Sequence, residues 1–556
     1  MKASDLFVRC LETEGVEYIF GLPGEETNDL MMSLLDSKKI KFILVRHEQG
    51  AAFMADVYGR ITQKVGVCLS TLGPGATNLT TGVANANMDR SPILAITGQT
   101  DTLLLHKESH QNMDIVTMFK PITKWNWSIR NADSIPEIVR RAFKISLEEK
   151  AGAVHLVLPH DIAKEKSDIE PIRTQELSRP RPTHKLVKIA AKMIAEAQQP
   201  LFLIGNGVVR GNATSCLRRF VEKTGVCSMN TFMAKGVISD RSERHLQTIG
   251  IKEADHAQIA MKEADLVVAI GYDLVEYNPK NWNRDLKKKI IHIDFTHAEV
   301  DTYYPPTLEI AADIEYTLDA ILDELEKEKK EENPDVNKFP RYEIPHLFKK
   351  IKQEIVWRTN RFNNDFSYPI KPQKLLQDVR NALDEKDIVI SDVGAHKLWI
   401  AKVYDTFSPN TCLITNGFCS MGFALPGAIA AQLARPKQKV VALCGDGGFL
   451  MNVQEIETAV RLKLPIIIIV WCDCDFGMIS LKQIDEFGKS AFTRFNNPNF
   501  VTLAQSFGAI GYDVKSTKEF RNVLEKAKES TNVPVIISIS VDYSRNRILL
   551  DDNFIG

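Results

Sequence analysis

Short apolar strands recur along this 556-residue chain, each followed by a glycine-containing turn and a helical stretch. Strands that are apolar throughout are buried on both faces, as in parallel sheets covered by helices. Because the chain is too long for one hydrophobic core, we expect an α/β protein with three Rossmann-like, doubly wound parallel-sheet domains. The expected strands are 41–45, 65–70, 91–97 and 153–159, then 200–205, 265–271 and 289–295, then 386–394, 439–448, 465–471 and 533–540.

Two stretches without apolar periodicity separate these three groups of strands. Residues 161–183 are charged and rich in proline, which is typical of a linker. Residues 323–338 form a charge run, which is usually a solvated helix and its exit. The predicted domains are therefore 1–165, 184–325 and 366–550.

The composition is that of an ordinary soluble globular protein, with 44% hydrophobic residues, 25% charged residues and a net charge of -1. No excess of Lys and Arg exists to neutralise phosphates, so we expect no nucleic-acid partner. The N-terminal stretch MKASDLFVRCLETEG is too acidic for a signal peptide, and no apolar run approaches the roughly 20 residues that span a bilayer. The odd number of cysteines, nine, favours reduced thiols and a cytoplasmic location without membrane contact.

The most informative segment is KVVALCGDGGFLMNVQ, in which a strand ends at Cys444 and a helix is expected from about Val453. Glycine-rich turns at helix starts point backbone N–H groups at an anion. A carboxylate beside phosphates requires a cation, and Mg²⁺ prefers such oxygen ligands. The next strand ends at Asp473, so we expect Asp446 and Asp473 at the same edge of the sheet. For an isolated GDG, a plain turn is the alternative; the turn glycines here are Gly445, Gly447 and Gly448.

The sequence WCDCDF at 471–476 is compatible with a metal site, a redox pair or a strand end. Residues two apart can share a face, so the spacing of Cys472 and Cys474 does not exclude a thiol site. However, no second Cys/His pair with metal-ligand spacing lies nearby. We therefore favour the strand end, with Asp473 as the functional residue.

This arrangement of strand, GDG turn, helix and strand resembles the thiamine-diphosphate signature. The resemblance implies thiamine diphosphate and Mg²⁺ as cofactors. The implied metal ligands are Asp446, Asp473 and the backbone carbonyl of Asp475. Cys472 stands where the family usually has Asn, at a place that is not a ligand in the family.

The resemblance also calls for a carboxylate near the start of the chain, which would engage N1′ of the cofactor's pyrimidine. Glu48, in FILVRHEQGAAFMADVYGR, follows an apolar strand and precedes a helix, and burial there should raise its pKa. With N1′ engaged, the cofactor's own 4′-amino group can act as the base that activates the thiazolium. The competing interpretation is a helix-capping Glu.

Further segments resemble other parts of the same cofactor site. The turns GLPG (21–24) and TLGPGATN (71–78) would let the backbone approach the pyrimidine, and DVGAHK (392–397) resembles the diphosphate-contacting loop. In NGFCSMGFALPGAIAAQ (416–432), the Met would wedge between the two rings and a backbone carbonyl would hold the 4′-amino group. The competing interpretation is that His396 and Met421 are ordinary packed residues without a role in cofactor binding. The implied cofactor-binding residues are Pro23, Gly24, Glu48, Gly73, Gly394, Ala395, His396, Cys419, Met421, Asp473 and Met478, together with the GDG turn at 445–448.

Over nearly its whole length, the chain is most similar to acetolactate synthases. The stretch LHKESHQNMDIVTMFKPITKW (105–125) resembles their HQ-containing loop, in which the Gln, here Gln111, hydrogen-bonds near the keto acid; His110 is its neighbour. The resemblance implies 2-acetolactate and CO2 as products from pyruvate and a second 2-keto acid. GYDLVEYNPKNWN (271–283) resembles the form without flavin, so FAD is not expected, although LIGNGVVRG (203–211) is a weak candidate for a dinucleotide turn.

Three positions depart from the biosynthetic pattern. Lys482 replaces a Trp that favours 2-ketobutyrate as acceptor, His160 replaces a Lys, and Phe476 stands at a place that is often Tyr. The second keto acid, the catabolic or biosynthetic role and a regulatory subunit therefore stay open. An ammonium at Lys482 could pair with a substrate carboxylate.

The family resemblance implies a homodimer as the minimum active form and favours a homotetramer, because the two cofactor-binding domains meet across a subunit interface. Two other functions compete with acetolactate synthesis. The first is another thiamine-diphosphate-dependent decarboxylase, lyase or carboligase. The second is a thiamine-diphosphate-binding scaffold with a regulatory role, against which the joint presence of Glu48, Asp446 and Asp473 argues.

Overall fold

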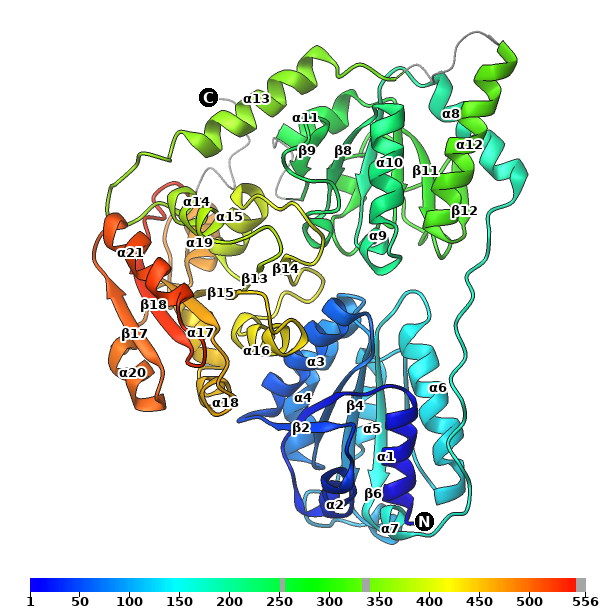
Figure 1. Ribbon diagram of the computed structural model, residues 1–556, viewed down its shortest axis with the longest axis vertical. Coiled ribbons are helices and arrows are strands. Elements are labelled where there is room, and N and C mark those ends of the chain that lie inside the picture. Colours follow the sequence, from blue (N-terminus) through cyan, green and yellow to red (C-terminus); the bar gives the residue numbers. More distant parts are fainter. Residues whose placement is uncertain (251–255, 333–340, 547–556) are drawn as a thin grey trace.

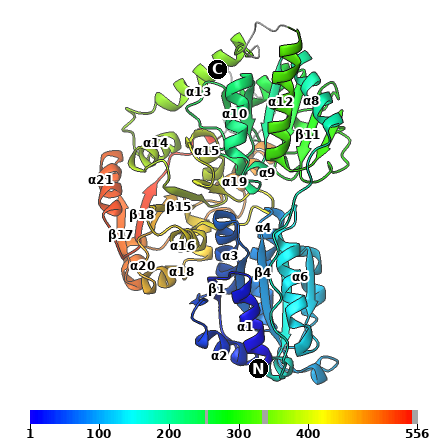
Figure 2. The same cartoon turned by 45° about the vertical axis from the view of Figure 1, so that its right-hand side comes forward.

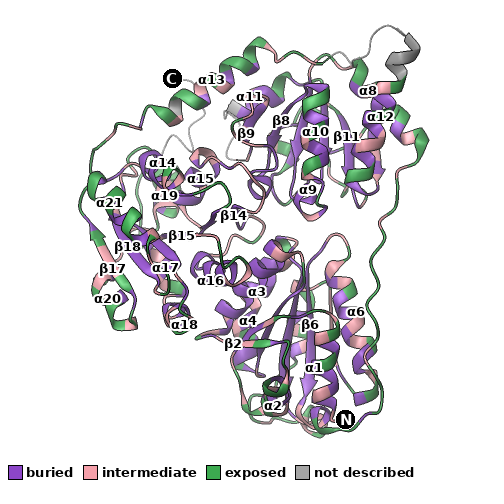
Figure 3. Ribbon diagram, in the orientation of Figure 1, coloured by how far each residue is buried: buried purple, intermediate pink, exposed green. Residues whose placement is uncertain are grey.

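The computed structural model describes residues 1–250, 256–332 and 341–546. They form three units, each built on one six-stranded sheet, which Figure 1 shows as a blue, a green and a yellow-to-red lobe. Neighbouring strands are parallel in all three sheets. The predicted α/β class with three parallel-sheet units is confirmed. Figure 3 shows the sheets as the buried centre of each unit, with exposed residues on the outer sides of the helices.

The first unit has the strand order β2-β1-β3-β4-β6-β5. The expected first strand is in fact the edge strand β2, and β1 precedes it. The N-terminal stretch, which is too acidic for a signal peptide, forms the helix α1 of the folded protein. The strands are β1 (Tyr18–Gly21), β2 (Lys41–Leu44), β3 (Gly66–Ser70), β4 (Ile93–Gln99), β5 (Trp125–Ser128) and β6 (Ala153–Pro159); the helices are α1 (Ala3–Thr13), α2 (Asn28–Asp36), α3 (Glu48–Thr62), α4 (Pro74–Met88), α5 (Ile115–Phe119), α6 (Ile135–Leu147) and α7 (His160–Lys164).

The second unit has the order β12-β11-β10-β7-β8-β9. Its strands β8, β9 and β12 are short and partly polar, which is why apolar runs alone do not predict them. The strands are β7 (Pro200–Ile204), β8 (Cys227–Asn230), β9 (His245–Thr248), β10 (Leu266–Ile270), β11 (Lys289–Asp294) and β12 (Leu308–Ala311); the helices are α8 (His184–Glu196), α9 (Gly207–Arg210), α10 (Thr214–Thr224), α11 (His256–Glu263), α12 (Ile314–Glu332) and α13 (His346–Asn360).

The third unit has the order β14-β13-β15-β16-β18-β17. The helix expected from about Val453 is α18, which begins at Glu455, and the expected glycine turn before it is in fact a separate short helix, α17, which begins at Asp446. The strands are β13 (Ile388–Ser391), β14 (Cys412–Ile414), β15 (Val440–Gly445), β16 (Ile467–Cys472), β17 (Ile510–Val514) and β18 (Val535–Ser540); the helices are α14 (Pro372–Ala382), α15 (Ala395–Val403), α16 (Ala424–Ala434), α17 (Asp446–Met451), α18 (Glu455–Arg461), α19 (Gly477–Phe487), α20 (Phe500–Phe507) and α21 (Thr517–Lys528).

The predicted linker differs from the structure at its start, because α7 covers residues 160–164. From there to α8, the chain forms neither helix nor strand apart from one isolated bridge, Lys2 with Lys166, and Figure 1 shows it running along the side of the molecule. The charge run at 323–338 lies in α12 as far as Glu332; its remainder lies outside the described residues.

The first and third units share one hydrophobic core. Figures 1 and 2 both show α3 beside α16, and the core includes buried residues of both helices. Phe53 on α3 meets Phe423, just before α16, in an edge-to-face contact with ring centroids 5.6 Å apart. A Cβ atom at Gly427 would lie 2.9 Å from a methyl group of Val57, so this glycine lets the two helices approach closely. The two units are therefore fixed relative to each other within one chain.

Candidate functional site

The two aspartates of the GDG segment are brought together at the ends of neighbouring strands. β15 pairs with β16, and Asp446 and Asp473 follow these strands. Asp446 is 1% exposed, and its Oδ2 accepts hydrogen bonds from the backbone N–H groups of Asp473 (3.1 Å) and Cys474 (2.8 Å). The side chain of Asn497 donates a further hydrogen bond of 2.7 Å to the same oxygen. Sequence reasoning missed Asn497, because no nearby motif marks it.

The electrostatics at this edge point to a cation. Burial, and then the negative charge of Asp446, raises the pKa of Asp473 to about 7. A divalent cation between these carboxylates would replace their repulsion by attraction. No group of three or more His, Cys, Asp or Glu side chains in the described parts of the chain could hold a metal. A cation here would therefore need backbone or amide oxygens as well; Oδ1 of Asn497 is buried without a hydrogen-bond partner among the described residues.

The two thiols of WCDCDF have different surroundings. Cys472 is partly buried, and burial, followed by the charge of Asp446, raises the pKa of its thiol well above the usual value. Cys474 is exposed, and its sulfur contacts the side-chain amide of Asn497 at 3.3 Å. All nine cysteines of the chain are free thiols. The geometry thus favours the strand-end interpretation, with the aspartate between the thiols as the functional residue.

The loop after β13 contacts the GDG turn, because β13 and β15 are neighbours. A Cβ atom at Gly448 would lie 3.0 Å from Asp392 Oδ2, and one at Gly445 would lie 3.1 Å from His396 Cε1. Glycine at both positions lets these two segments approach closely. Gly394 and Ala395 start α15, so their N–H groups lie at a helix N-terminus, where anions bind favourably.

His396 has a buried nitrogen that lacks a partner. Its side chain is 3% exposed, and burial lowers the pKa of the imidazole to about 3, so it is neutral at physiological pH. Its Nε2 has no hydrogen-bond partner within the described residues. A polar ligand at the loop 392–397 would satisfy this atom. The unpartnered nitrogen argues against the interpretation of His396 as a satisfied core residue.

Asp392 ties the loop after β13 to the segment around Met421. Its carboxylate accepts hydrogen bonds from the backbone N–H groups of Val393 (2.7 Å) and Gly422 (2.9 Å). Burial raises the pKa of Asp392 to about 7, against the lowering effect of these bonds. Met421 is half-buried, and Cys419 has a positive φ of 57°, which is uncommon for a residue other than glycine. Met478 lies in the first turn of α19.

Glu48 is the first residue of α3 and is 8% exposed. The N-cap is His47, whose Nδ1 accepts from the N–H of Gln49 at 3.1 Å, so Glu48 is not the capping residue. Its Oε2 accepts a hydrogen bond of 2.9 Å from the side-chain amide of Asn78. Because Asn78 is on α4, the first turns of α3 and α4 together orient this carboxylate.

Glu455, which sequence reasoning missed, holds the turn before Glu48. Its Oε1 accepts from the backbone N–H groups of Arg46 and His47, each at 3.0 Å, and Thr458 donates to its Oε2 at 2.7 Å. The side chain is fully buried, and burial raises the pKa of Glu455 to about 7. The only sequence signal is its place at the start of α18, nine residues after the aspartate of the GDG turn.

The remaining predicted residues lie at the strand ends of the first sheet. Gly73 has a φ of 47°, and a Cβ atom there would lie 2.6 Å from the carbonyl oxygen of Gln111, so the HQ loop packs on the 71–78 turn. A Cβ atom at Gly24 would lie 2.3 Å from the Cβ atom of Thr71, so this glycine packs closely against the 71–78 turn. Pro23 and Gln111 are exposed.

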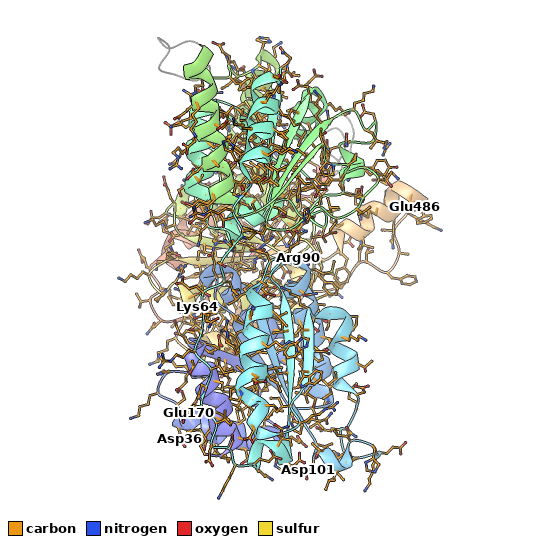
Figure 4. The ribbon with its side chains drawn as sticks, turned by 90° about the vertical axis from the view of Figure 1, so that its right-hand side faces the viewer. Asp36, Lys64, Arg90, Asp101, Glu170 and Glu486 are labelled. Atoms are coloured by element: carbon orange, nitrogen blue, oxygen red, sulfur yellow. The ribbon has the colours of Figure 1, made fainter. Side chains whose placement is uncertain are left out.

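Glu48 and Gln111 form no hydrogen bond with the GDG turn or with the loop 392–397 among the described residues. In Figure 4, Asp101, which precedes the HQ loop, lies at the far end of the first unit, and Glu486 of α19 projects from the third unit.

Comparison with known proteins defines the class first. Residues 1–118 match the family described as the N-terminal TPP binding domain of thiamine pyrophosphate enzymes, residues 187–321 match their central domain, and residues 392–539 match their C-terminal TPP binding domain. This fold and site thus define a thiamine-pyrophosphate-dependent enzyme. Across the described residues, no helix combines the length and the apolar character needed to cross a membrane.

Similarity over the whole chain gives the particular family. The chain is 34% identical to the acetolactate synthase of Bacillus subtilis, over 99% of this chain and 95% of that protein. It is 34% identical to a probable acetolactate synthase large subunit of Methanococcus aeolicus, over 98% and 92% of the two chains. It is 32% identical to the catabolic acetolactate synthase of Raoultella terrigena, over 98% and 96%. The chain belongs to the acetolactate synthase family.

Asp446 of the GDG turn and Asp475 of WCDCDF are expected to differ in their response to amide substitution. Asp446→Asn removes a carboxylate at the metal edge, so Mg²⁺-dependent binding of thiamine diphosphate should weaken at least about tenfold in calorimetry, given the strength of charge-assisted contacts. Asp475→Asn keeps the backbone carbonyl and should bind with nearly wild-type affinity. Equal loss in both variants would contradict the assignment of Asp475 through its carbonyl.

The stability of the protein is expected to depend on the proton of Glu455. The folded protein holds this proton up to about pH 7, whereas the unfolded chain releases it near pH 4.5. The stability that it contributes is full below pH 4.5 and is lost as the pH rises to about 7. Glu455→Gln keeps an oxygen that accepts from both N–H groups but has no proton to lose. The melting temperature of this variant minus that of the wild type should therefore increase from pH 5 to pH 8. A difference that is constant across this range would refute the raised pKa.

Proposed function

We propose that the protein is an acetolactate synthase that converts two 2-keto acid molecules, pyruvate as donor and a second keto acid as acceptor, into 2-acetolactate and CO2. The observation that carries this proposal is similarity to acetolactate synthases over 98–99% of the chain, together with the aspartate pair at the GDG edge. The division into domains 1–165, 184–325 and 366–550 belongs to the same proposal.

The residues present fit the two expected cofactors. Mg²⁺ would be held by Asp446, Asp473 and the carbonyl of Asp475, where burial and the charge of Asp446 raise the pKa of Asp473. The diphosphate would lie against the N–H groups of Gly394 and Ala395 and the unpartnered Nε2 of His396. When bound, thiamine diphosphate supplies the acidic carbon and the electron sink that decarboxylation of a 2-keto acid requires.

Glu48 is proposed to hold a proton at N1′ of the pyrimidine. Its side chain is buried, and the amide of Asn78 fixes one oxygen so that the other is available to the ring. On the cofactor's other side, the Cys419 carbonyl would hold the 4′-amino group and Met421 would separate the two rings. Gln111 would donate to the keto acid; its exposure in one chain leaves it accessible.

The middle unit supports the proposal that FAD is not bound. The candidate turn after β7 is closed by the turn after β10. A Cβ atom at Gly205 would lie 2.2 Å from the carbonyl oxygen of Gly271, and the N–H of Gly207 donates to that oxygen at 2.8 Å. The N–H of Asn206 donates to Glu276 at 3.0 Å. These donors are used inside the unit, whereas a dinucleotide turn presents them to phosphate.

We propose a homodimer as the minimum active form, and a homotetramer as the favoured assembly. Support comes from the family resemblance, which implies that the Glu48-bearing domain of one chain meets the GDG-bearing domain of another across a subunit interface. The cytoplasm is the proposed location, given nine free thiols.

The product assay tests the reaction. Wild-type protein with thiamine diphosphate, Mg²⁺ and pyruvate should yield acetoin after acidification, because 2-acetolactate decarboxylates in acid. Glu48→Gln should lower pyruvate consumption about 100-fold or more, since general acid–base assistance is worth roughly that much, whereas Glu25→Gln should not. Acetaldehyde or acetate in place of acetoin would favour another thiamine-dependent decarboxylase or lyase. Unchanged turnover in Glu48→Gln would remove Glu48 from the mechanism.

Mixing two inactive variants tests the shared site. If Glu48 of one subunit acts with Asp446 of the other, a heterodimer of Glu48→Gln and Asp446→Asn chains contains one intact site and one doubly damaged site. Subunit exchange at equal amounts should then restore about a quarter of the wild-type activity, because half of the dimers would be mixed. No recovery, with exchange confirmed by mass spectrometry, would place both residues in one chain's site.

A further inference from the structure

The segment between β14 and α16 is held from outside its own unit. It runs through residues 415–423 without helix or strand and carries Cys419 and Met421. The carboxylate oxygen Oδ1 of Asp89, at the end of α4, accepts hydrogen bonds from the N–H groups of Asn416 (3.2 Å) and Gly417 (2.6 Å). The first unit therefore fixes the start of a segment that belongs to the third unit.

A second residue of α4 holds the same segment. Asn85 Oδ1 accepts from the Thr415 hydroxyl at 2.7 Å and from the N–H of Ser420 at 3.4 Å. Asn85 is fully buried and Asp89 is 1% exposed, so water does not compete for these bonds. Arg60 Nη1 lies 3.5 Å from the other oxygen of Asp89, and Arg60 Nη2 donates to the carbonyl of Ile414 at 2.9 Å. Asp89, Arg60 and Asn85 thus together hold the start of the segment in place.

Asn416 joins all three units. Its N–H donates to Asp89 of the first unit, and its side-chain nitrogen donates to the carbonyl of Glu276 in the second unit at 2.8 Å. Its side-chain oxygen accepts from the Lys397 ammonium of the third unit at 2.9 Å. Figure 4 places Arg90, the residue after Asp89, at the level where the first unit meets the second.

The contacts of Asp89, Asn85 and Asn416 hold Cys419 in a backbone conformation that is unfavourable without them. Cys419 has a φ of 57°, in a region that residues other than glycine rarely adopt, and such a conformation persists only where the surroundings impose it. The Lys397 ammonium also contacts Cys419 Sγ at 2.9 Å, so the junction reaches this residue directly. The carbonyl direction of Cys419 and the place of Met421 therefore follow from contacts made outside the segment.

We propose that Asp89 and Asn416 are positioning residues, which set Cys419 and Met421 at the geometry that binds the pyrimidine of thiamine diphosphate in its bent form. This inference rests on the proposed cofactor site. It gives the buried charge of Asp89 a role in cofactor affinity as well as in domain packing. Neither residue touches the cofactor itself.

Calorimetric binding of thiamine diphosphate with saturating Mg²⁺ tests the proposal. Asp89→Ala and Asn416→Ala should each weaken binding about tenfold or more. The first variant loses the two hydrogen bonds from the N–H groups of the segment, and the second loses the two side-chain hydrogen bonds of Asn416. Asp89→Asn, whose amide oxygen can still accept from the same N–H groups, should recover most of the affinity. This rescue separates a positioning role from a requirement for the charge alone.

The matched control is Asn87→Ala on the same helix. Asn87 Oδ1 accepts from the N–H of Ala153 at 3.2 Å within the first unit, so this variant should melt at a lower temperature and yet bind the cofactor normally. Wild-type affinity in Asp89→Ala, with only a lower melting temperature, would overturn the proposal.

A milder variant keeps the test valid if Asp89→Ala does not fold. Thr415→Val removes only the hydroxyl that donates to Asn85 and should weaken cofactor binding about threefold. Unchanged affinity would overturn the proposal. Because the readout is binding, a wild-type protein that binds the cofactor but forms no acetoin would contradict the proposed reaction and leave this inference intact.

Discussion

The apolar contact between α3 and α16 is the constraint on which the rest of the structure depends. It merges the first and third units into one core, in which Phe53 packs against Phe423. Such close-packed contacts do not tolerate sliding, so they fix the relative position of everything attached to the two helices. Glu48 starts α3, and the segment that we propose to bend the cofactor precedes α16, so the contact sets the geometry of both.

Buried carboxylates at both ends of this core fix the position of segments that carry predicted site residues. At one end, Glu455 accepts two N–H groups from the turn that aims Glu48. At the other end, Asp89 accepts two N–H groups from the segment that carries Cys419. Both carboxylates are buried, which is costly unless hydrogen bonds repay the lost hydration. If Glu48 and the GDG turn of one chain serve different active sites, as we propose, these contacts connect two sites of a dimer through one rigid core.

Much of the site could be predicted where its residues follow apolar strands directly. Asp446 and Asp473 were placed correctly because parallel strands end at one edge, and strand ends are visible as the limits of apolar runs. The helix α17 was not predicted, since the glycines at 445–448 suggest a turn although the helix begins at Asp446. The short strands β8, β9 and β12 escaped prediction because they lack long apolar runs.

The sequence by itself determined the α/β class, the sheet-edge aspartates and the family, because each depends on residues close together in the chain or on their order along it. Only the tertiary structure decided what holds these parts in place. Glu455 and Arg46 are 409 positions apart, and Asp89 and Asn416 are 327 positions apart, so no local pattern relates them. The contact of α3 with α16 was likewise decided by packing, since the order of residues along a chain does not state which helices meet in space.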